Sequence, residues 1–143
     1  RNAVGAAAAI VALALISLLD WRAQRRQSQE NAAVDADSLP IMSMADLKRY
    51  DGQDAPLVYC LRGRIYDVSS SINFAPGGAY SFLAGADCTV GLSKMSHDRA
   101  FVNRIEWSEL TEEEWAVVDH WVDYMDGKYK CVARLREFIG RHH

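Results

Sequence analysis

An apolar run at the N-terminal end of the chain restricts the possible folds more than any other feature. Between Ala3 and Leu19 there is no charged residue and a single hydroxyl group, that of Ser17. A helix rises about 1.5 Å per residue, so the run would be roughly 26 Å long. That length is near the lower limit for crossing the hydrocarbon core of a bilayer. We therefore expect residues 3–19 to form one transmembrane helix.

The residues after this run predict its orientation. Asp20 ends the run, and Trp21 stands where an interfacial aromatic side chain is typical. Three arginines come next at positions 22, 25 and 26, against Arg1 alone on the other side. The positive-inside rule then places the C-terminal part on the cytoplasmic or matrix side. We expect a single-pass protein of the endoplasmic reticulum or the mitochondrial inner membrane.

Two other interpretations of the apolar run stay open. A secretory signal has a shorter apolar region and would be removed. A buried helix of a soluble domain is disfavoured, because the arginines and the polar stretch from Ala23 to Ser38 separate the run from the rest of the chain. We expect a polar linker at 20–40, a globular domain at 41–138 and a short tail at 139–143.

The globular part predicts short helices mixed with short strands, which is an α+β domain. Ser43 and Thr111 each precede an acidic residue by three positions, the spacing of a capping box. The first helix is expected to end near Tyr50, and Asp87 is expected to cap another. Residues 57–61 and 64–68 have the β-branched and aromatic content of strands, and 128–135 is expected to be a returning strand.

Composition excludes several classes of function. The formal net charge is -3 with both signs interspersed, whereas a nucleic-acid binder would show a basic stripe. The three cysteines are far apart and form no CxxC pair, so a zinc or thioredoxin-like site is unsupported. No Gly-x-Ser-x-Gly motif or metal-ligand spacing is present, and we expect that the protein is not an enzyme.

Several motifs in fixed order resemble the cytochrome b5-like haem/steroid-binding domain, and more narrowly the membrane-associated progesterone receptor family. They are the strand Gly63-Arg-Ile-Tyr-Asp-Val68, a Pro-x-Gly-x-Tyr loop ending in Tyr80, and Gly127-Lys-Tyr129 ahead of a Val-x-x-Leu run. The similarity covers roughly Met42 to Leu135. It implies a b5-like fold behind an N-terminal membrane anchor.

The resemblance also implies a ligand and the residues that hold it. In this family haem iron is held by one tyrosine phenolate, which here matches Tyr80. Lys128 and Tyr129 match positions at the pocket edge, where they can hydrogen-bond the ligand or a propionate. Gly77 and Gly78 would let the macrocycle lie against backbone. The implied cofactor is haem b, with Tyr80 as the metal ligand.

The sequence departs from these patterns at two positions. Cytochrome b5 places a histidine before Pro-Gly-Gly, and this chain has Ala75 there. The family often has a second tyrosine where this chain has Phe74, so one hydroxyl group is lost. His97 falls roughly where a second ligand would lie, although a surface or core role is expected for it.

The pattern supports two functions. The first is a membrane-anchored protein that binds haem or a steroid-like ligand and docks partner membrane proteins, in the family's case cytochromes P450. The second is an accessory structural subunit of a membrane complex, such as a mitochondrial respiratory complex, in which the b5-like pocket is vestigial. The altered Phe74 and Ala75 favour the second function, and the retained Tyr80, Lys128 and Tyr129 favour the first.

Overall fold

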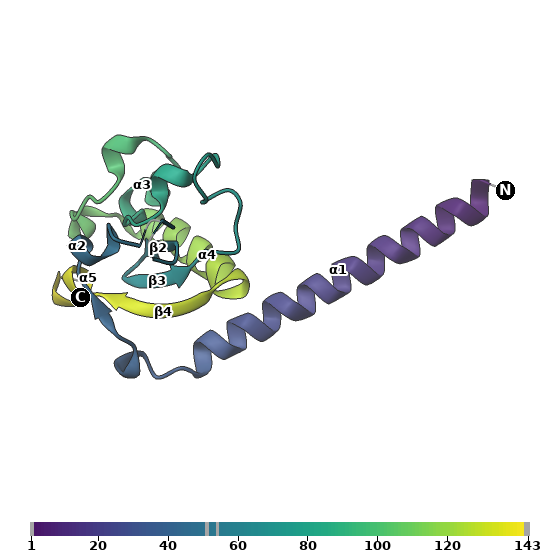
Figure 1. Cartoon of the computed structure of the whole chain (residues 1–143), viewed down its shortest axis with the longest axis horizontal. Coiled ribbons are helices and arrows are strands. Elements are labelled where there is room, and N and C mark those ends of the chain that lie inside the picture. The colour runs from purple at the N-terminus through teal and green to yellow at the C-terminus, as the bar shows by residue number, and fades with distance from the viewer. Residues whose placement is uncertain (1, 51, 54, 142–143) are drawn as a thin grey trace.

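The chain forms one long N-terminal helix joined to a small α+β domain (Figure 1). The computed structural model describes residues 2–50, 52–53 and 55–141. The helices are α1 (Asn2–Ala33), α2 (Met44–Leu47), α3 (Thr89–Ser93), α4 (Glu112–Lys128) and α5 (Arg136–Arg141). The strands are β1 (Ile41–Met42), β2 (Val58–Leu61), β3 (Arg64–Asp67) and β4 (Lys130–Leu135).

The four strands form one sheet in the order β1-β4-β3-β2. β1 pairs with β4 in parallel, and the other pairs are antiparallel. Arg62 and Gly63 connect β2 to β3, and both have positive φ, as a two-residue hairpin turn requires. A Cβ atom at Gly63 would lie 2.4 Å from the ring of Phe138, so glycine is needed there for packing as well. The strands predicted at 57–61 and 64–68 are confirmed.

The sheet is covered on both faces, which explains why every residue of β2 is buried. Alternate residues of this strand enter two different clusters. Tyr59 and Leu61 pack with residues of α4, and Val58 and Cys60 pack with Trp107 and others. A cavity opens on the α4 side of the sheet.

Both predicted capping boxes are present. The side chains of Ser43 and Thr111 accept hydrogen bonds from the backbone N–H groups of Asp46 and Glu114, whose carboxylates bond back to the capping residues. Two details differ from expectation. The first helix ends at Leu47, before Tyr50. Asp87 does not cap α3, because it is fully buried and accepts hydrogen bonds from Thr89 and Trp107 instead.

The segment expected to be a polar linker is largely helical. α1 continues without a break from the apolar run to Ala33 and packs against α4. The extended connection is limited to the residues between α1 and β1, which include one turn of 3-10 helix at Ala36–Ser38. Helix formation satisfies the backbone of residues 20–33, and packing on the domain holds the last turns in place.

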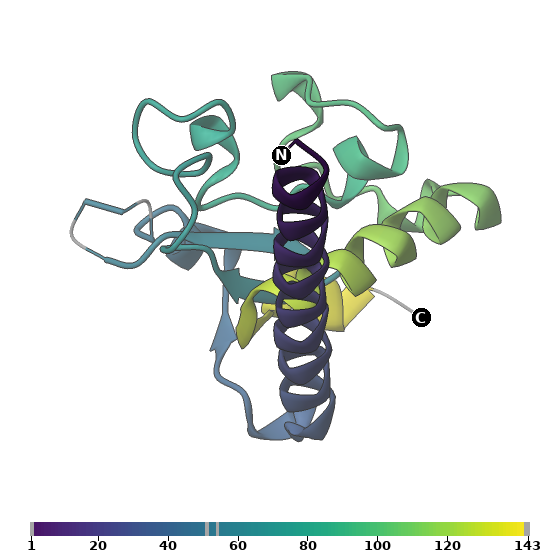
Figure 2. The same ribbon diagram turned by 90° about the vertical axis from the view of Figure 1, so that its right-hand side faces the viewer.

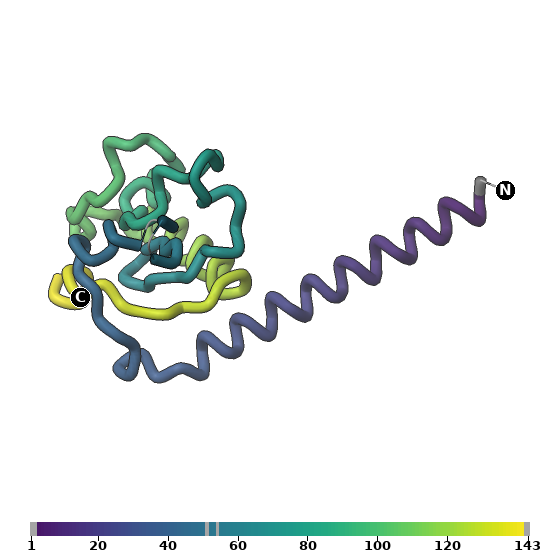
Figure 3. The backbone as a smooth tube through the Cα atoms, viewed as in Figure 1, coloured from purple at the N-terminus to yellow at the C-terminus, as the bar shows by residue number. Residues whose placement is uncertain are grey.

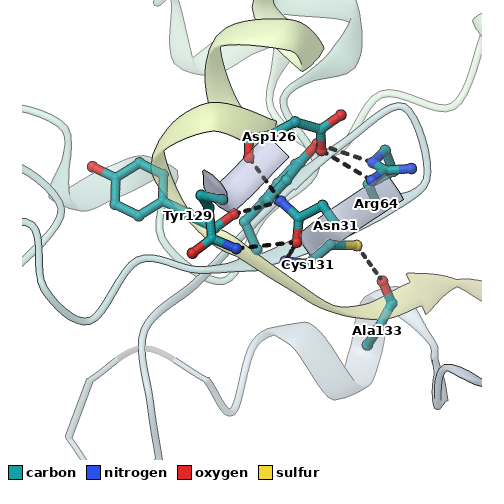
Figure 4. Close-up of polar contacts among 8 residues, drawn as sticks. Asn31, Arg64, Asp126, Tyr129, Cys131 and Ala133 are labelled. Atoms are coloured by element: carbon teal, nitrogen blue, oxygen red, sulfur yellow. Dashed lines mark hydrogen bonds and ion pairs between the residues drawn. The ribbon is translucent and has the colours of Figure 1, made fainter. Parts of the chain in front are cut away.

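Asn31 attaches the end of α1 to the domain (Figure 4). Its amide nitrogen donates to the carbonyl oxygens of Asp126 at 2.9 Å and Tyr129 at 2.8 Å. Its amide oxygen accepts from the backbone N–H of Cys131 at 2.9 Å. The side chain is only 6% exposed. One buried asparagine therefore joins α1 to the turn between α4 and β4.

The two ends of the described chain lie far apart (Figure 3). The N-terminal end is at the tip of α1, and the C-terminal end is on the opposite side of the domain. The tail expected at 139–143 instead continues α5 as far as Arg141, and Phe138 of this helix is buried in the core. Residues 142–143 lie outside the described part.

Candidate ligand-binding cavity

A cavity of about 250 Å³ opens between the loop after β3 and the C-terminal half of α4. Its walls are mostly aromatic and aliphatic, with several phenol groups and one lysine. The lining residues are Tyr59, Ser71, Asn73, Phe74, Tyr80, Leu83, Leu92, His97, Trp121, Tyr124, Met125, Lys128 and Tyr129. Ligand sites commonly enclose about 300–1,000 Å³, so a ligand of larger size would extend beyond the mouth.

Tyr80 presents a phenol group to this cavity. Its backbone N–H donates to the carbonyl of Asn73 at 2.8 Å, which fixes the end of the loop. Its ring lies 6.2 Å from that of Phe74 and 5.0 Å from that of His97, between ring centroids. The side chain is 38% exposed, and no residue in the described part of the chain hydrogen-bonds its hydroxyl group. The hydroxyl is thus available to a ligand.

Gly77 and Gly78 shape the loop and are not among the residues that line the cavity. Gly77 has a φ of +84°, which favours glycine. A Cβ atom at Gly78 would lie 2.4 Å from the carbonyl oxygens of Ile72 and Asn73. The glycines thus shape the tight turn before Tyr80. A Cβ atom at Gly77 would meet nothing within 4 Å, and the expected contact of these glycines with the ligand stays a prediction.

Lys128 and Tyr129 close the opposite wall. Lys128 is the last residue of α4 and not part of the strand as predicted, and Tyr129 caps that helix. The Lys128 Nζ donates to the Tyr124 hydroxyl at 3.0 Å, and this hydrogen bond raises the pKa of the lysine. The Tyr129 ring stands edge-on to Phe74, with 6.5 Å between centroids. The fold thus brings Tyr80, Lys128 and Tyr129 to one cavity.

Tyr59 is a cavity residue that the sequence predicts only as part of a strand. It lies on β2 with its ring 5.2 Å from that of Phe74, and burial raises its pKa well above the ordinary value. Its neighbours along β2 are all buried, so the strand pattern alone does not distinguish it. Trp121 and Tyr124 of α4 also line the cavity and were not singled out from the sequence. Their spacing from Lys128 along α4 is the sequence signal that could have identified them as cavity residues.

Asn31 connects this cavity to α1. Figure 4 shows the ring of Tyr129 pointing away from Asn31, while the backbone carbonyl of the same residue accepts the Asn31 hydrogen bond. Beside it, Asp126 accepts hydrogen bonds from Arg64 at 2.9 Å and from the Tyr66 hydroxyl at 2.8 Å. The wall formed by Tyr129 is therefore held from behind by a polar network.

A second hollow, of about 440 Å³, lies near β4 and α5 and contains three arginines. Each arginine has a carboxylate partner: Arg62 pairs with Asp119, Arg64 with Asp126, and Arg134 with Asp37. Because these charges are already paired, the hollow lacks the free donors of an anion site. The cavity containing Tyr80 is the stronger candidate for ligand binding.

Comparison with known proteins agrees with this architecture. Residues 43–139 match the family described as "Cytochrome b5-like Heme/Steroid binding domain". A solved structure of an Arabidopsis thaliana protein with a cytochrome b5-like fold superposes with a TM-score of 0.60 at 32% identity. The superposition covers 68% of this chain and 91% of the other.

Curated relatives carry names of ligand-binding and regulatory proteins. Membrane steroid-binding protein 2 of Arabidopsis thaliana is 48% identical over 66% of this chain and 42% of its own length. The cytochrome P450 regulator dap1 of Schizosaccharomyces pombe is 35% identical over 64% of this chain and 60% of its own length. Human membrane-associated progesterone receptor component 2 is 31% identical over 70% of this chain and 49% of its own length. The match therefore spans about half the length of these relatives.

Proposed function

This chain belongs to the cytochrome b5-like haem/steroid-binding domain family, and from that premise we propose that it is a membrane-anchored protein whose cavity binds haem b through Tyr80. One observation carries the proposal. A partly exposed phenol group without a protein hydrogen-bond partner in the described part of the chain stands in a cavity lined mainly by apolar and aromatic side chains. Such a cavity suits a flat apolar ligand that brings its own polar centre.

The donor set fits haem better than a free metal ion. Within residues 2–50, 52–53 and 55–141, no group of three or more His, Cys, Asp or Glu side chains could hold a metal ion. Iron would need a macrocycle for most of its ligands, with Tyr80 as the protein donor. A phenolate is a hard anionic ligand that favours ferric iron, as in catalase, and bound haem would supply that ferric centre.

Lys128 and Tyr129 would orient the ligand without binding iron. The ammonium group of Lys128 is a compact positive charge suited to a carboxylate. Tyr129, 7% exposed, presents an aromatic surface to the side of a flat molecule. With one anionic donor from the protein, a role in haem storage, haem transfer or haem-dependent regulation would be favoured over fast electron transfer, and we propose no enzymatic activity.

The name of the fission yeast relative supports a protein partner of the cytochrome P450 class. We further propose that α1 crosses a membrane with the domain on the arginine-rich side. Of the described residues, Ala3–Ala33 form one helix long and apolar enough to cross a bilayer, and the side chains of its apolar window are not buried by the domain. Three arginines stand directly after the apolar run, which agrees with the positive-inside rule.

Haemin titration of the purified full chain in detergent micelles tests the ligand assignment. Tyr80→Phe keeps the ring packing and removes only the oxygen, so we expect roughly tenfold weaker binding or more, with loss of the high-spin ferric tyrosinate spectrum. His97→Ala is the matched control, because this ring stacks beside Tyr80 on the same cavity, and it should retain the spectrum. A chain that loses haemin with His97→Ala but not with Tyr80→Phe would show the donor to be wrong.

A further inference from the structure

The end of the apolar run lies beside the mouth of the cavity. A hollow between α1 and α4 is lined by Trp21 and Arg25 on one side and by Tyr124 and Gly127 on the other. Tyr124 also lines the ligand cavity. The hydrogen bond from Lys128 to the Tyr124 hydroxyl raises the pKa of this lysine most, and the charge of Asp20 on α1 adds to that rise. The point where α1 would leave a bilayer is therefore next to the cavity wall.

The opposite rim of the cavity projects in the same direction. The loop after β3 and the turn from α4 to β4 lie on the side of the domain from which α1 extends (Figure 1). Figure 2 faces that side and shows the teal loop on one side of α1 and α4 on the other. Ile72 of this loop is 84% exposed, the most exposed large hydrophobic side chain in the described part of the chain.

The chemistry of this rim is that of a membrane interface. Trp21 is 52% exposed, and the guanidinium group of Arg25 lies 5.3 Å from its ring centroid. Lys128 lies over the ring of Tyr124 at 5.4 Å. Aromatic rings beside basic groups are enriched where helices leave a bilayer. Arg25 and Asp123 are the charged residues that line the hollow between α1 and α4, and Lys128 adds a second positive charge at the cavity edge.

The orientation of the rim is fixed by the attachment of α1. Asn31 bonds to three backbone groups around the α4–β4 turn, so the domain does not swing freely on a linker. A Cβ atom at Gly127 would lie 3.4 Å from the Ser28 hydroxyl, which shows how closely α4 approaches α1. Because α1 is held to the domain both at Asn31 and beside Gly127, the direction of α1 in a bilayer would set the orientation of the whole domain.

We propose that the mouth of the cavity rests on the bilayer surface and that its apolar ligand enters and leaves through the lipid leaflet. The contact consists of Ile72 on one rim and Trp21, Tyr124 and Lys128 on the other. The inference rests on the proposed membrane anchor. It also accounts for a cavity of only about 250 Å³, because the part of a ligand that extends beyond the mouth is covered by lipid.

Depth measurements on the full chain in phosphatidylcholine vesicles with one fifth phosphatidylglycerol, roughly the anionic share used to mimic a charged leaflet, test the contact. A fluorophore is attached at Ile72→Cys or, as a control, at Ala45→Cys, an exposed position on α2 away from α1. The native cysteines are all buried. We expect nitroxide-labelled lipid to quench the label at Ile72→Cys and aqueous iodide to quench the label at Ala45→Cys.

Two outcomes separate this inference from the proposed anchor. If alkaline carbonate released the chain from the membrane, the proposed membrane anchor would be wrong. A chain that resists carbonate while iodide quenches both labels equally would overturn the bilayer contact alone.

For the entry route, haemin is supplied either in the vesicles that carry the chain or in separate vesicles. We expect uptake from the chain's own vesicles to be faster by roughly an order of magnitude, because desorption into water is avoided. Equal rates would overturn the route.

Discussion

Replacing Asn31 by alanine should destabilise the domain, although Asn31 lies outside the region that matches the family. The change removes the partner of the Tyr129 carbonyl and of the Cys131 N–H, both at buried hydrogen bonds. A buried polar group left without a partner costs about 1–3 kcal/mol. The third bond, to the Asp126 carbonyl, is partly exposed and water can replace it. We expect a total loss of about 3 kcal/mol, because water reaches some of the vacated space.

Urea unfolding of the full chain in detergent micelles measures this loss. A domain of this size has an m value near 1.5 kcal/mol per molar urea, so the midpoint should fall by about 2 M. Tryptophan emission is a suitable signal because Trp107 is 1% exposed in the core. Gln27→Ala is the matched control. Gln27 lies one turn earlier and makes only a 3.4 Å contact with Asn31, so its removal should cost less than about 0.5 kcal/mol.

Asn31→Asp provides a second comparison. The carboxylate can still accept from Cys131, but it places oxygen where the Tyr129 carbonyl needs a donor. The loss should equal or exceed that of Asn31→Ala. If Asn31→Ala unfolds at the same urea concentration as Gln27→Ala, the end of α1 is not part of the folded domain, and the fixed orientation of the cavity rim fails with it.

The remaining predictions concern three other parts of the chain. Thr111→Ala should cost about 1 kcal/mol in the same urea assay, because it removes a helix cap; an unchanged midpoint would reject that role. Burial raises the pKa of Asp87 to about 6. The native state therefore keeps a proton that the unfolded chain releases, and this contribution to stability is lost as pH rises from 4 to 6. Asp87→Asn should remove about 3 kcal/mol of that pH dependence, and parallel pH profiles for parent and variant would contradict the shift. Extraction with alkaline carbonate should leave the chain in the membrane pellet, because α1 exposes its apolar side chains.

Local signals in the sequence were sufficient for several elements. The capping boxes at Ser43 and Thr111 depend on side chains three residues apart, so both could be predicted without tertiary information. The strands predicted at 57–61 and 64–68 are equally local, because their β-branched and aromatic content is sufficient to mark them. The order of motifs from Gly63 to Tyr129 was enough to predict the family, which the match of residues 43–139 confirms.

Other features depend on contacts that no local pattern contains. A polar composition at residues 20–33 fits both a solvated linker and a helix packed on the domain. The packed helix forms because Asn31 hydrogen-bonds backbone groups about 100 residues away in the sequence. The close approach of α4 to α1, where a Cβ atom at Gly127 would lie 3.4 Å from the Ser28 hydroxyl, is another contact of this kind. Tyr59 appears in sequence only as one of a run of buried strand residues. Its place in the cavity depends on Phe74 from a distant loop.

The roles of individual cavity residues remain predictions. The structure brings Tyr80, Lys128 and Tyr129 to one cavity, as the resemblance to the family implied. Gly77 and Gly78 lie in the turn before Tyr80, and their contact with the ligand stays a prediction. The geometry supports the proposal of Tyr80 as the donor for iron and of Lys128 as an orienting residue.

The visible absorption spectrum of the full chain, purified from its native membrane without added haemin, tests the central proposal most directly. Haem bound through the Tyr80 phenolate should give a Soret band, high-spin ferric features and close to one haem per chain. The same preparation of Tyr80→Phe should lose most of that absorbance while remaining folded in the urea assay. A folded parent chain with no Soret band, and none after incubation with haemin, would contradict haem binding by this cavity.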